Sequence, residues 1–438
     1  MSHPTHRRRF LKTTAALGAG YFVAAGVRAD QSKSPNEQIA MASIGVGGKG
    51  SSDSSSAGRA GRMVAICDVD TKRLGGAGNR YKDAKQFVDF REMLEKMGDK
   101  IDAVTVSTPD HTHAAAALMA MRMGKHCFCQ KPMTHSIYEA RLMGQVAKEK
   151  GVATQMGNQG TAQSGLRHAA ALLQAGRLGK VSEVHVWTNR PIWPQGGPRP
   201  EPTDPPAHLE WDLWIGPAPM RPYGPGYHPF AWRGWWDFGT GALGDMACHT
   251  MNMPFMGLNL RDPISVQAVT SGHNRDSYPK WSSITYEFPG NDQRGPLTMF
   301  WYDGGKRAPA EVLGGRKPSG SGCVVVGEKG TIYSPNDSGS GFDVIKGEID
   351  KEIEFEKSPG HFDEWVRAIK GGPAAVSNFP GYAAPLTETV LLGNLAVWTA
   401  AEGEGPKVEW DAKNLKAKNI EGLEEIIKPE YREGYKLG

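Results

Sequence analysis

Three glycines near the start of the chain have a spacing that suits the binding of phosphate groups. Gly45, Gly47 and Gly50 form a G-x-G-x-x-G motif after an apolar segment and ahead of a run of serines that opens a predicted helix. The first glycine permits a tight turn, the second lets the backbone approach a pyrophosphate, and the third allows close helix packing. Because a helix N-terminus attracts anions, the motif predicts a dinucleotide site.

Asp68 strengthens this interpretation and indicates which dinucleotide is bound. It ends the next apolar segment, at the distance along the chain where a carboxylate receives the ribose hydroxyls of the adenosine. A carboxylate there repels the 2′-phosphate of NADP, so we expect NAD, tightly held. Lys72 and Arg73 lie near enough in sequence to keep NADP as the alternative. A solvent-facing aspartate at the end of a strand is the alternative for Asp68, and the glycine motif ahead of it argues against that alternative.

A second pair of polar residues lies much later in the chain. Asp245 and His249 are four residues apart, just after a glycine-rich segment. On a helix they share one face, so both can point at a substrate. The alternative is that Asp245 caps the helix and His249 is an ordinary buried histidine.

Two loops place further polar side chains at the ends of predicted strands. Ser107, Thr108 and His113 belong to the sequence S-T-P-D-H-T-H, and Lys131 belongs to C-Q-K-P. Pro132 restricts Lys131 to extended backbone, which directs it toward the crevice at the strand ends. A surface lysine in a turn is the alternative for this residue alone.

With these loops the sequence resembles the Gfo/Idh/MocA family of NAD(P)-dependent oxidoreductases. That family carries a T-P-x-x-x-H loop, an E-K-P loop and a later D-x-x-x-H pair at these places, and the resemblance runs from about Ile39 to the last helices. Gln130 stands where the family usually has Glu, and a neutral amide gives the Lys131 ammonium less electrostatic support.

The resemblance implies roles for the residues that match. It adds four members to the cofactor site, namely Ser107, Thr108, His113 and Lys131. It implies a catalytic group of Lys131, Asp245 and His249, with His249 as the acid/base and Asp245 orienting its ring. The activity implied is oxidation of a CH–OH group of a sugar, glycoside or polyol by hydride transfer to NAD(P), in a homo-oligomer.

Two other functions fit the same residues. An NAD-dependent glycoside hydrolase of this fold oxidises the sugar transiently and reduces it again, so that its net reaction is redox-neutral. A non-catalytic sugar- or nucleotide-binding protein is the second alternative, against which the aligned Asp245 and His249 argue.

The elements that must position these residues follow from hydrophobic patterning. Strand patterns at residues 39–46, 63–69, 101–107, 126–129 and 152–156 alternate with helical ones, including residues 113–123 and a helix from the capping box at Ser136 to about Lys150. This predicts a doubly wound parallel sheet, a Rossmann domain at residues 39–157. Residues 158–438 are predicted to form an α+β domain with a large open mixed or antiparallel sheet.

Within that second domain the expected elements are short. We predict helices at residues 165–175, 362–369 and 386–400, and strands at residues 181–188, 264–269, 283–288, 297–301, 323–326 and 331–333. Residues 196–227 are dense in Pro, Gly and aromatic residues, so we expect a long loop without regular structure near the site.

The N-terminus has the order of an export signal. Arg7-Arg8-Arg9-Phe10-Leu11-Lys12 follows the twin-arginine pattern, a weakly apolar run comes next, and Val27-x-Ala29 fits a cleavage site. We therefore expect a signal peptide at residues 1–29, a polar arm at residues 30–38, and a periplasmic mature protein exported in the folded state. An ordinary buried helix with a basic start is the alternative.

Composition excludes several other classes of protein. The net charge is +4, but the leader holds five basic residues and no acid, which leaves 46 basic against 47 acidic residues and no footprint for nucleic acid. No apolar run is long enough to span a membrane in the mature chain. The five cysteines form no disulfide framework. His111 and His113 lack a third ligand in sequence, so we expect no metal site.

Overall fold

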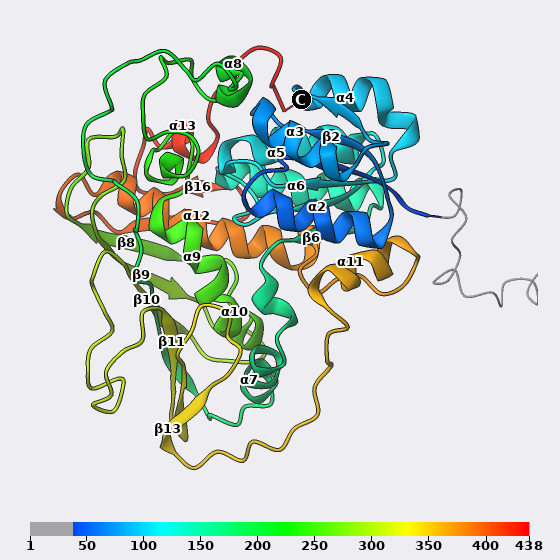
Figure 1. Ribbon diagram of the computed structural model, residues 1–438. Helices are drawn as coiled ribbons and strands as arrows, with labels where there is room; N and C mark the ends of the chain where they lie inside the picture. Colours follow the sequence, from blue (N-terminus) through cyan, green and yellow to red (C-terminus); the bar gives the residue numbers. More distant parts are fainter. Residues whose placement is uncertain (1–37, 438) are drawn as a thin grey trace, which may run out of the picture.

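The computed structural model describes residues 38–437, which form two sheets with helices packed around them (Figure 1). The predicted export signal at residues 1–29 and the arm at residues 30–38, apart from Gln38, lie outside this part of the chain. Within it, no helix is both long and apolar enough to cross a membrane.

The first sheet is parallel and has six strands in the order β3-β2-β1-β4-β5-β6. The strands are β1 (Ala40–Ile44), β2 (Arg62–Cys67), β3 (Lys85–Phe87), β4 (Ala103–Val106), β5 (His126–Cys129) and β6 (Thr154–Met156). Alternate residues face two different cores, as Ala42 and Met41 do, because helices cover both faces. Strand order reverses between β1 and β4, so a crevice opens at their carboxyl ends.

The helices of this half are short and end at recognisable residues. They are α2 (Lys49–Ala60), α3 (Thr71–Arg80), α4 (Phe90–Met97), α5 (Asp110–Arg122) and α6 (Ile137–Lys150). The capping box predicted for α6 is present: the Ser136 hydroxyl accepts the Glu139 N–H, and the Glu139 carboxylate accepts the Ser136 N–H. Gly151 ends α6 in the left-handed region, with φ of 62°.

The second sheet is large and mixed, as the sequence pattern predicted. Its order is β13-β12-β11-β7-β10-β9-β8-β15-β16, with β14 on β8, and only the β7–β10 pair is parallel. The strands are β7 (Val181–Trp187), β8 (Ser265–Thr270), β9 (Ser282–Phe288), β10 (Leu297–Tyr302), β11 (Gly322–Gly327), β12 (Gly330–Ser334), β13 (Asp343–Gly347), β14 (Gly403–Glu404), β15 (Val408–Asp411) and β16 (Lys416–Ala417). On β9, buried residues alternate with half-buried ones, so one face of the sheet packs on helices.

Helices of the second half lie between the sheets and beside them (Figure 1). They are α7 (Ser164–Gln174), α8 (Trp211–Ile215), α9 (Gly241–Thr250), α10 (Asn252–Leu258), α11 (His361–Ile369), α12 (Ala384–Thr399) and α13 (Glu424–Ile427). Helix α12 contacts α6 of the first half and strands β8 and β9 of the second, so it joins the two sheets.

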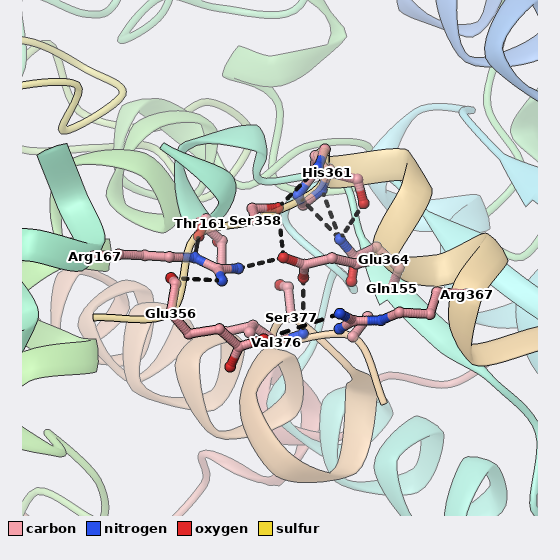
Figure 2. Close-up of polar contacts among 12 residues, drawn as sticks. Gln155, Thr161, Arg167, Glu356, Ser358, His361, Glu364, Arg367, Val376 and Ser377 are labelled. Carbon is pink, nitrogen blue, oxygen red and sulfur yellow. Dashed lines mark hydrogen bonds and ion pairs between the residues drawn. The ribbon is translucent and has the colours of Figure 1, made fainter. Parts of the chain in front are cut away.

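Helix α11 returns to the first sheet from far along the chain. Its Trp365 is fully buried in the same core as Met41 and Phe128, and the indole N–H donates to the Ala153 carbonyl at 3.0 Å. Figure 2 shows the polar contacts at its start, where Glu364 receives the Arg167 guanidinium of α7. The first sheet is therefore covered in part by late-chain residues.

Some elements differ from the sequence-based expectation. Residues 196–227 are not wholly irregular, because α8 forms at Trp211–Ile215, where Trp211 stacks on Trp214 with ring centroids 4.8 Å apart. Helix α5 begins at Asp110, three residues before the predicted start, so both loop histidines lie in its first turn. Strand β3 was missed because it is a three-residue edge strand with two exposed side chains.

Candidate active site

A cleft of about 570 Å³ lies at the carboxyl ends of β1, β2, β4 and β5. Of the predicted site residues, seven line it: Gly45, Gly47, Asp68, Ser107, Thr108, Lys131 and His249. The other three, Gly50, His113 and Asp245, are not lining residues, but each is hydrogen-bonded to one, namely Gly47, Thr108 and Lys131. The cleft thus brings together side chains from both halves of the chain.

The glycine-rich loop has the close contacts that its motif predicts. Gly45 has φ of +78°, and a Cβ there would lie 2.5 Å from the Ser107 carbonyl oxygen. A Cβ on Gly50 would collide with the Gly45 carbonyl, so this glycine lets α2 approach the loop. Among the described residues, the N–H groups of Gly48 and Lys49 at the start of α2 find no acceptor. This loop therefore fits a pyrophosphate.

Asp68 holds this loop in place from the end of β2. One carboxylate oxygen accepts the N–H of Val46 at 2.9 Å and of Gly47 at 3.2 Å, and the other accepts the Asp70 N–H at 2.9 Å. Burial raises the pKa of Asp68, although these backbone donors and Arg73 act against that rise. Its position at the cleft wall suits contact with a ribose, and Arg73 lines the same wall.

Gln130, which stands where the family usually has Glu, is hydrogen-bonded to Asp53 of α2. The Gln130 amide donates to the Asp53 carboxylate at 2.8 Å, and the Ser107 hydroxyl donates to the same oxygen at 2.8 Å. The Lys49 ammonium pairs with the other oxygen. A glutamate at position 130 would bring a second carboxylate against Asp53, so the amide suits this neighbour.

The two loop histidines are structural. His113 is buried, with one ring nitrogen 2.9 Å from the Thr108 carbonyl and the other 2.9 Å from the Pro132 carbonyl, so it ties the two site loops together. His111 lies between the carbonyls of Phe238 and Trp214. Burial lowers the pKa of His113 to about 4 and that of His111 to about 3.

Asp245 lies on α9 and is surrounded by cations. Lys131 donates to its carboxylate at 2.9 Å and also to its backbone carbonyl, and Arg233 donates from Nε at 3.1 Å. The Arg190 guanidinium lies 3.9 Å away. Burial alone would raise the pKa of Asp245, but Lys131 and Arg233 hold it well below its usual value. Asp245 is mid-helix, so the alternative that it caps the helix is wrong.

His249 lies one turn further along α9, on the face that borders the cleft. Burial and the nearby Lys131 ammonium lower the pKa of His249 to about 3, against the opposing effect of Asp245. The imidazole is therefore neutral at physiological pH. Within the described chain its ring makes no hydrogen bond. Oδ1 of Asp245 accepts from both Lys131 and Arg233, so the expected contact by which Asp245 would orient the His249 ring is not present.

Three charged residues of the site were not singled out from the sequence. Arg233 belongs to the W-R-G-W-W segment beside the predicted pair, so that segment could have indicated it. Arg190 and Asp53 carry no local signal, because their site neighbours are distant in sequence. No group of three or more His, Cys, Asp or Glu side chains within residues 38–437 is arranged to hold a metal.

Comparison with known proteins identifies the family of this chain. Residues 17–158 match the NAD-binding Rossmann fold of the Gfo/Idh/MocA oxidoreductase family, and residues 179–437 match that family's C-terminal alpha/beta domain. The chain belongs to this family. This oxidoreductase is 32% identical over 119 residues to inositol 2-dehydrogenase of Rubrobacter xylanophilus, covering 26% of the chain and 33% of that protein. It is 23% identical over 188 residues to levoglucosan dehydrogenase of Pseudarthrobacter phenanthrenivorans, covering 43% of the chain and 40% of that protein.

The oxidoreductase therefore spans less than half the length of these two relatives. Solved structures show the same fold at low identity. The WlbA dehydrogenase of Bordetella pertussis, in complex with NADH and UDP-GlcNAcA, superposes with a TM-score of 0.60 and 17% identity, covering 85% of this chain and 99% of that one. Aldose-aldose oxidoreductase of Caulobacter crescentus superposes with a TM-score of 0.55 and 17% identity, covering 85% and 100%.

Proposed function

We propose that this oxidoreductase oxidises a CH–OH group of a sugar, glycoside or polyol, with NAD as hydride acceptor. The observation that carries the proposal is the meeting of Lys131, from the end of β5, with Asp245 and His249 of α9 at the cleft that holds the glycine-rich loop. The dehydrogenases of inositol and levoglucosan among the relatives support the class of substrate.

The residues that would hold NAD are those of the loop and the strand ends. The N–H groups of Gly48 and Lys49 would bind the pyrophosphate, and Asp68 would bind the ribose of the adenosine. When bound, the nicotinamide supplies the hydride acceptor. The Asp68 carboxylate favours NAD over NADP, while Arg73 beside it offers the 2′-phosphate a partner.

His249 is suited to accept the proton of the substrate hydroxyl. A base must be unprotonated before it accepts a proton, and the pKa of His249 is lowered to about 3 by burial and by Lys131. Because the ring has no protein partner among the described residues, its orientation would be fixed by the substrate and the cleft wall.

Lys131 is suited to stabilise the negative charge that develops on the substrate oxygen. An ammonium has three N–H donors, and two of them are used on the Asp245 carboxylate and carbonyl. The third remains for a substrate oxygen at the cleft, where Lys131 is a lining residue. We propose that Asp245 acts as a positioning residue for Lys131.

We also propose that the enzyme works in the periplasm after twin-arginine export, with NAD tightly bound before transport. The support is the R-R-x-F-L-K sequence near the N-terminus. A periplasmic enzyme has no soluble NAD pool to draw on, so it must retain the nucleotide through catalysis. Near-stoichiometric NAD released on denaturing protein purified from the periplasm would support this; an empty protein recovered from the cytoplasm would overturn it.

The test of the reaction is a panel of sugars, polyols and aryl glycosides incubated with the purified protein, with nucleotide absorbance and product mass both followed. The expected result is that at least one compound loses two mass units through oxidation while NAD is reduced. Release of an aglycone without net NAD reduction would instead identify a redox-neutral hydrolase. Tight nucleotide or sugar binding without any turnover would identify a binding protein.

A further inference from the structure

The cluster of side chains around Asp245, beside Lys131 at the cleft, holds more positive than negative charge. Lys131, Arg190 and Arg233 all approach the single carboxylate of Asp245, at 2.9, 3.9 and 3.1 Å respectively. Their side chains are only 15%, 23% and 23% exposed, so water screens them little. Such an excess of half-buried charge is costly unless a ligand offsets it.

Other arginines of the same region do not share their acid in this way. Arg221 pairs with Asp237, and Arg199 pairs with Asp276. Each of these two guanidinium groups thus has a carboxylate of its own, whereas the cations around Asp245 share one.

No other group near Asp245 supplies a full compensating charge. Asp110 lines the cleft, but its carboxyl is buried beneath the hydroxyl of Thr240, which donates to it at 2.6 Å. Burial raises the pKa of Asp110 to about 7, so it is only partly ionised at neutral pH. His249 adds no charge of either sign there, because its imidazole is neutral.

Arg233 is held rigidly in a position to bind an anion. Its guanidinium lies over the rings of Trp232 at 4.2 Å and Phe230 at 4.9 Å from their centroids. Nε donates to Asp245 and Nη1 to the Phe230 carbonyl at 3.2 Å. Within the described chain Nη2 has no acceptor, and Arg233 lines the cleft. A planar guanidinium fixed in this way is preorganised for carboxylate or phosphate oxygens.

We propose that the substrate is an anionic sugar, whose carboxylate or phosphate oxygens bind Arg233, with Arg190 and Lys131 adding to the attraction. This rests on the proposed function and deepens it, because it names the charge of the sugar rather than the reaction. The nucleotide pyrophosphate is assigned elsewhere, to the start of α2, so it does not account for these cations.

The experiment compares matched pairs of substrates. Methyl glucuronide against methyl glucoside isolates a carboxylate, and glucose 6-phosphate against glucose isolates a phosphate. We expect kcat/KM to favour one anionic member by about ten- to hundredfold, which is the usual contribution of a charged hydrogen bond. Equal values within both pairs, with NAD still reduced, would overturn the proposal while leaving the proposed function in place.

Variants then assign the preference to Arg233. Arg233→Gln is expected to remove most of the discrimination and leave the affinity for NAD unchanged, and Arg190→Gln to reduce it partly. Arg199→Gln is the matched control, because Arg199 pairs with an aspartate of its own, Asp276, and not with Asp245. Loss of NAD affinity in Arg233→Gln would assign the cation to the nucleotide and overturn the proposal.

If no sugar is oxidised, the proposed function is rejected, but the proposed anion site can still be tested by calorimetric titration. Glucuronate and inorganic phosphate are the ligands, and glucose is the neutral control. Saturable binding of one anion that Arg233→Gln abolishes would support the proposal. Absence of binding by both anions would reject it.

Discussion

His249 and Lys131 border the same cleft, and their opposite protonation states suit opposite tasks. The neutral imidazole can accept a proton, whereas the ammonium, held by two contacts to Asp245, can only donate hydrogen bonds. Placing a cation beside the base also opposes its protonation, which keeps the base free at neutral pH. Lys131, the residue proposed to stabilise the substrate oxygen, thus keeps the His249 ring neutral and at the same time makes it a weaker base.

His249→Asn is expected to lower kcat by about 10²–10⁴-fold, the usual contribution of a general base, with NAD affinity unchanged. Because the pKa of His249 is lowered to about 3, its protonation should cause no loss of kcat/KM as the pH falls from about 8 to about 5. His168→Asn on α7, outside the cleft, is the control. Wild-type turnover in His249→Asn would remove this residue from the mechanism.

Gln130→Glu should destabilise the protein by about 1–3 kcal/mol, because it sets a second carboxylate at 2.8 Å from Asp53. The second change Asp53→Asn should restore most of that stability by giving the new glutamate a donor. Urea denaturation of both variants and of Asp53→Asn alone measures the coupling. Additive effects of the two changes would show that the residues do not interact.

The partner of Gln130 illustrates what the sequence could not reveal about single residues. Asp53 and Gln130 are 77 positions apart, and only folding brings them together. The motifs predicted the positions of Lys131 and of the glycines because those depend on local backbone geometry. They did not predict that Arg190 and Arg233 also approach Asp245, because these two arginines lie in separate segments without a periodic pattern.

At the level of single elements, the start of α6 carries a buried acid. Glu139 is 2% exposed, and burial raises its pKa to about 7 against the pull of the N–H groups of Ser136 and His135. An acid whose pKa is raised on folding binds its proton more tightly in the native state. Its contribution to stability is therefore present at low pH and is lost as the pH rises from about 4.5 through about 7.

Glu139→Gln should keep the capping box, because an amide oxygen also accepts the Ser136 N–H. It should abolish the loss of stability that the wild type shows as the pH rises. Relative to wild type, the variant is expected to gain about 1–3 kcal/mol of unfolding free energy between about pH 5 and about pH 8. Ser136→Ala is the matched control, with a loss of about 1 kcal/mol at every pH. A gain that does not change with pH would contradict the buried charge.

Elements with a strong period or a clear cap were predictable from sequence, and short ones were not. Helix α6 was indicated by Ser136 and Glu139, which satisfy each other locally. Helix α8 forms in a segment rich in Pro and Gly because Trp211 and Trp214 stack on one another and pack on Phe238. The contacts to Phe238 are tertiary, so the local sequence does not predict them.

At the scale of the whole molecule, a buried ion pair fastens α7 to α11 (Figure 2). Arg167 and Glu364 are 5% and 1% exposed, and Glu364 also accepts the Ser358 hydroxyl and the Val376 N–H. Arg167 in turn donates to the Thr161 carbonyl at 2.9 Å. Residues 161–167, residues 358–364 and Val376 thus meet at one carboxylate and one guanidinium.

Glu364→Ala should lower the free energy of unfolding by about 3–5 kcal/mol, because it leaves the Arg167 charge buried without its partner. Glu92→Ala is the control, since its pair with Lys96 is 43% and 65% exposed and should be worth less than about 1 kcal/mol. Thermal melts of both variants give the comparison. Similar small losses in the two would show that the buried pair adds little.

Because Trp365 packs on the first sheet, the core of that sheet can be completed only late in synthesis. The ribosome makes this residue 212 positions after Ala153, to which its indole N–H is bonded. At roughly 5–20 residues per second, the ring that covers Met41 and Phe128 is made on the order of 10–40 s after Ala153. During that interval the apolar surface that Trp365 covers stays exposed, so we expect the nucleotide-binding half to pack fully only after residue 365 has been made.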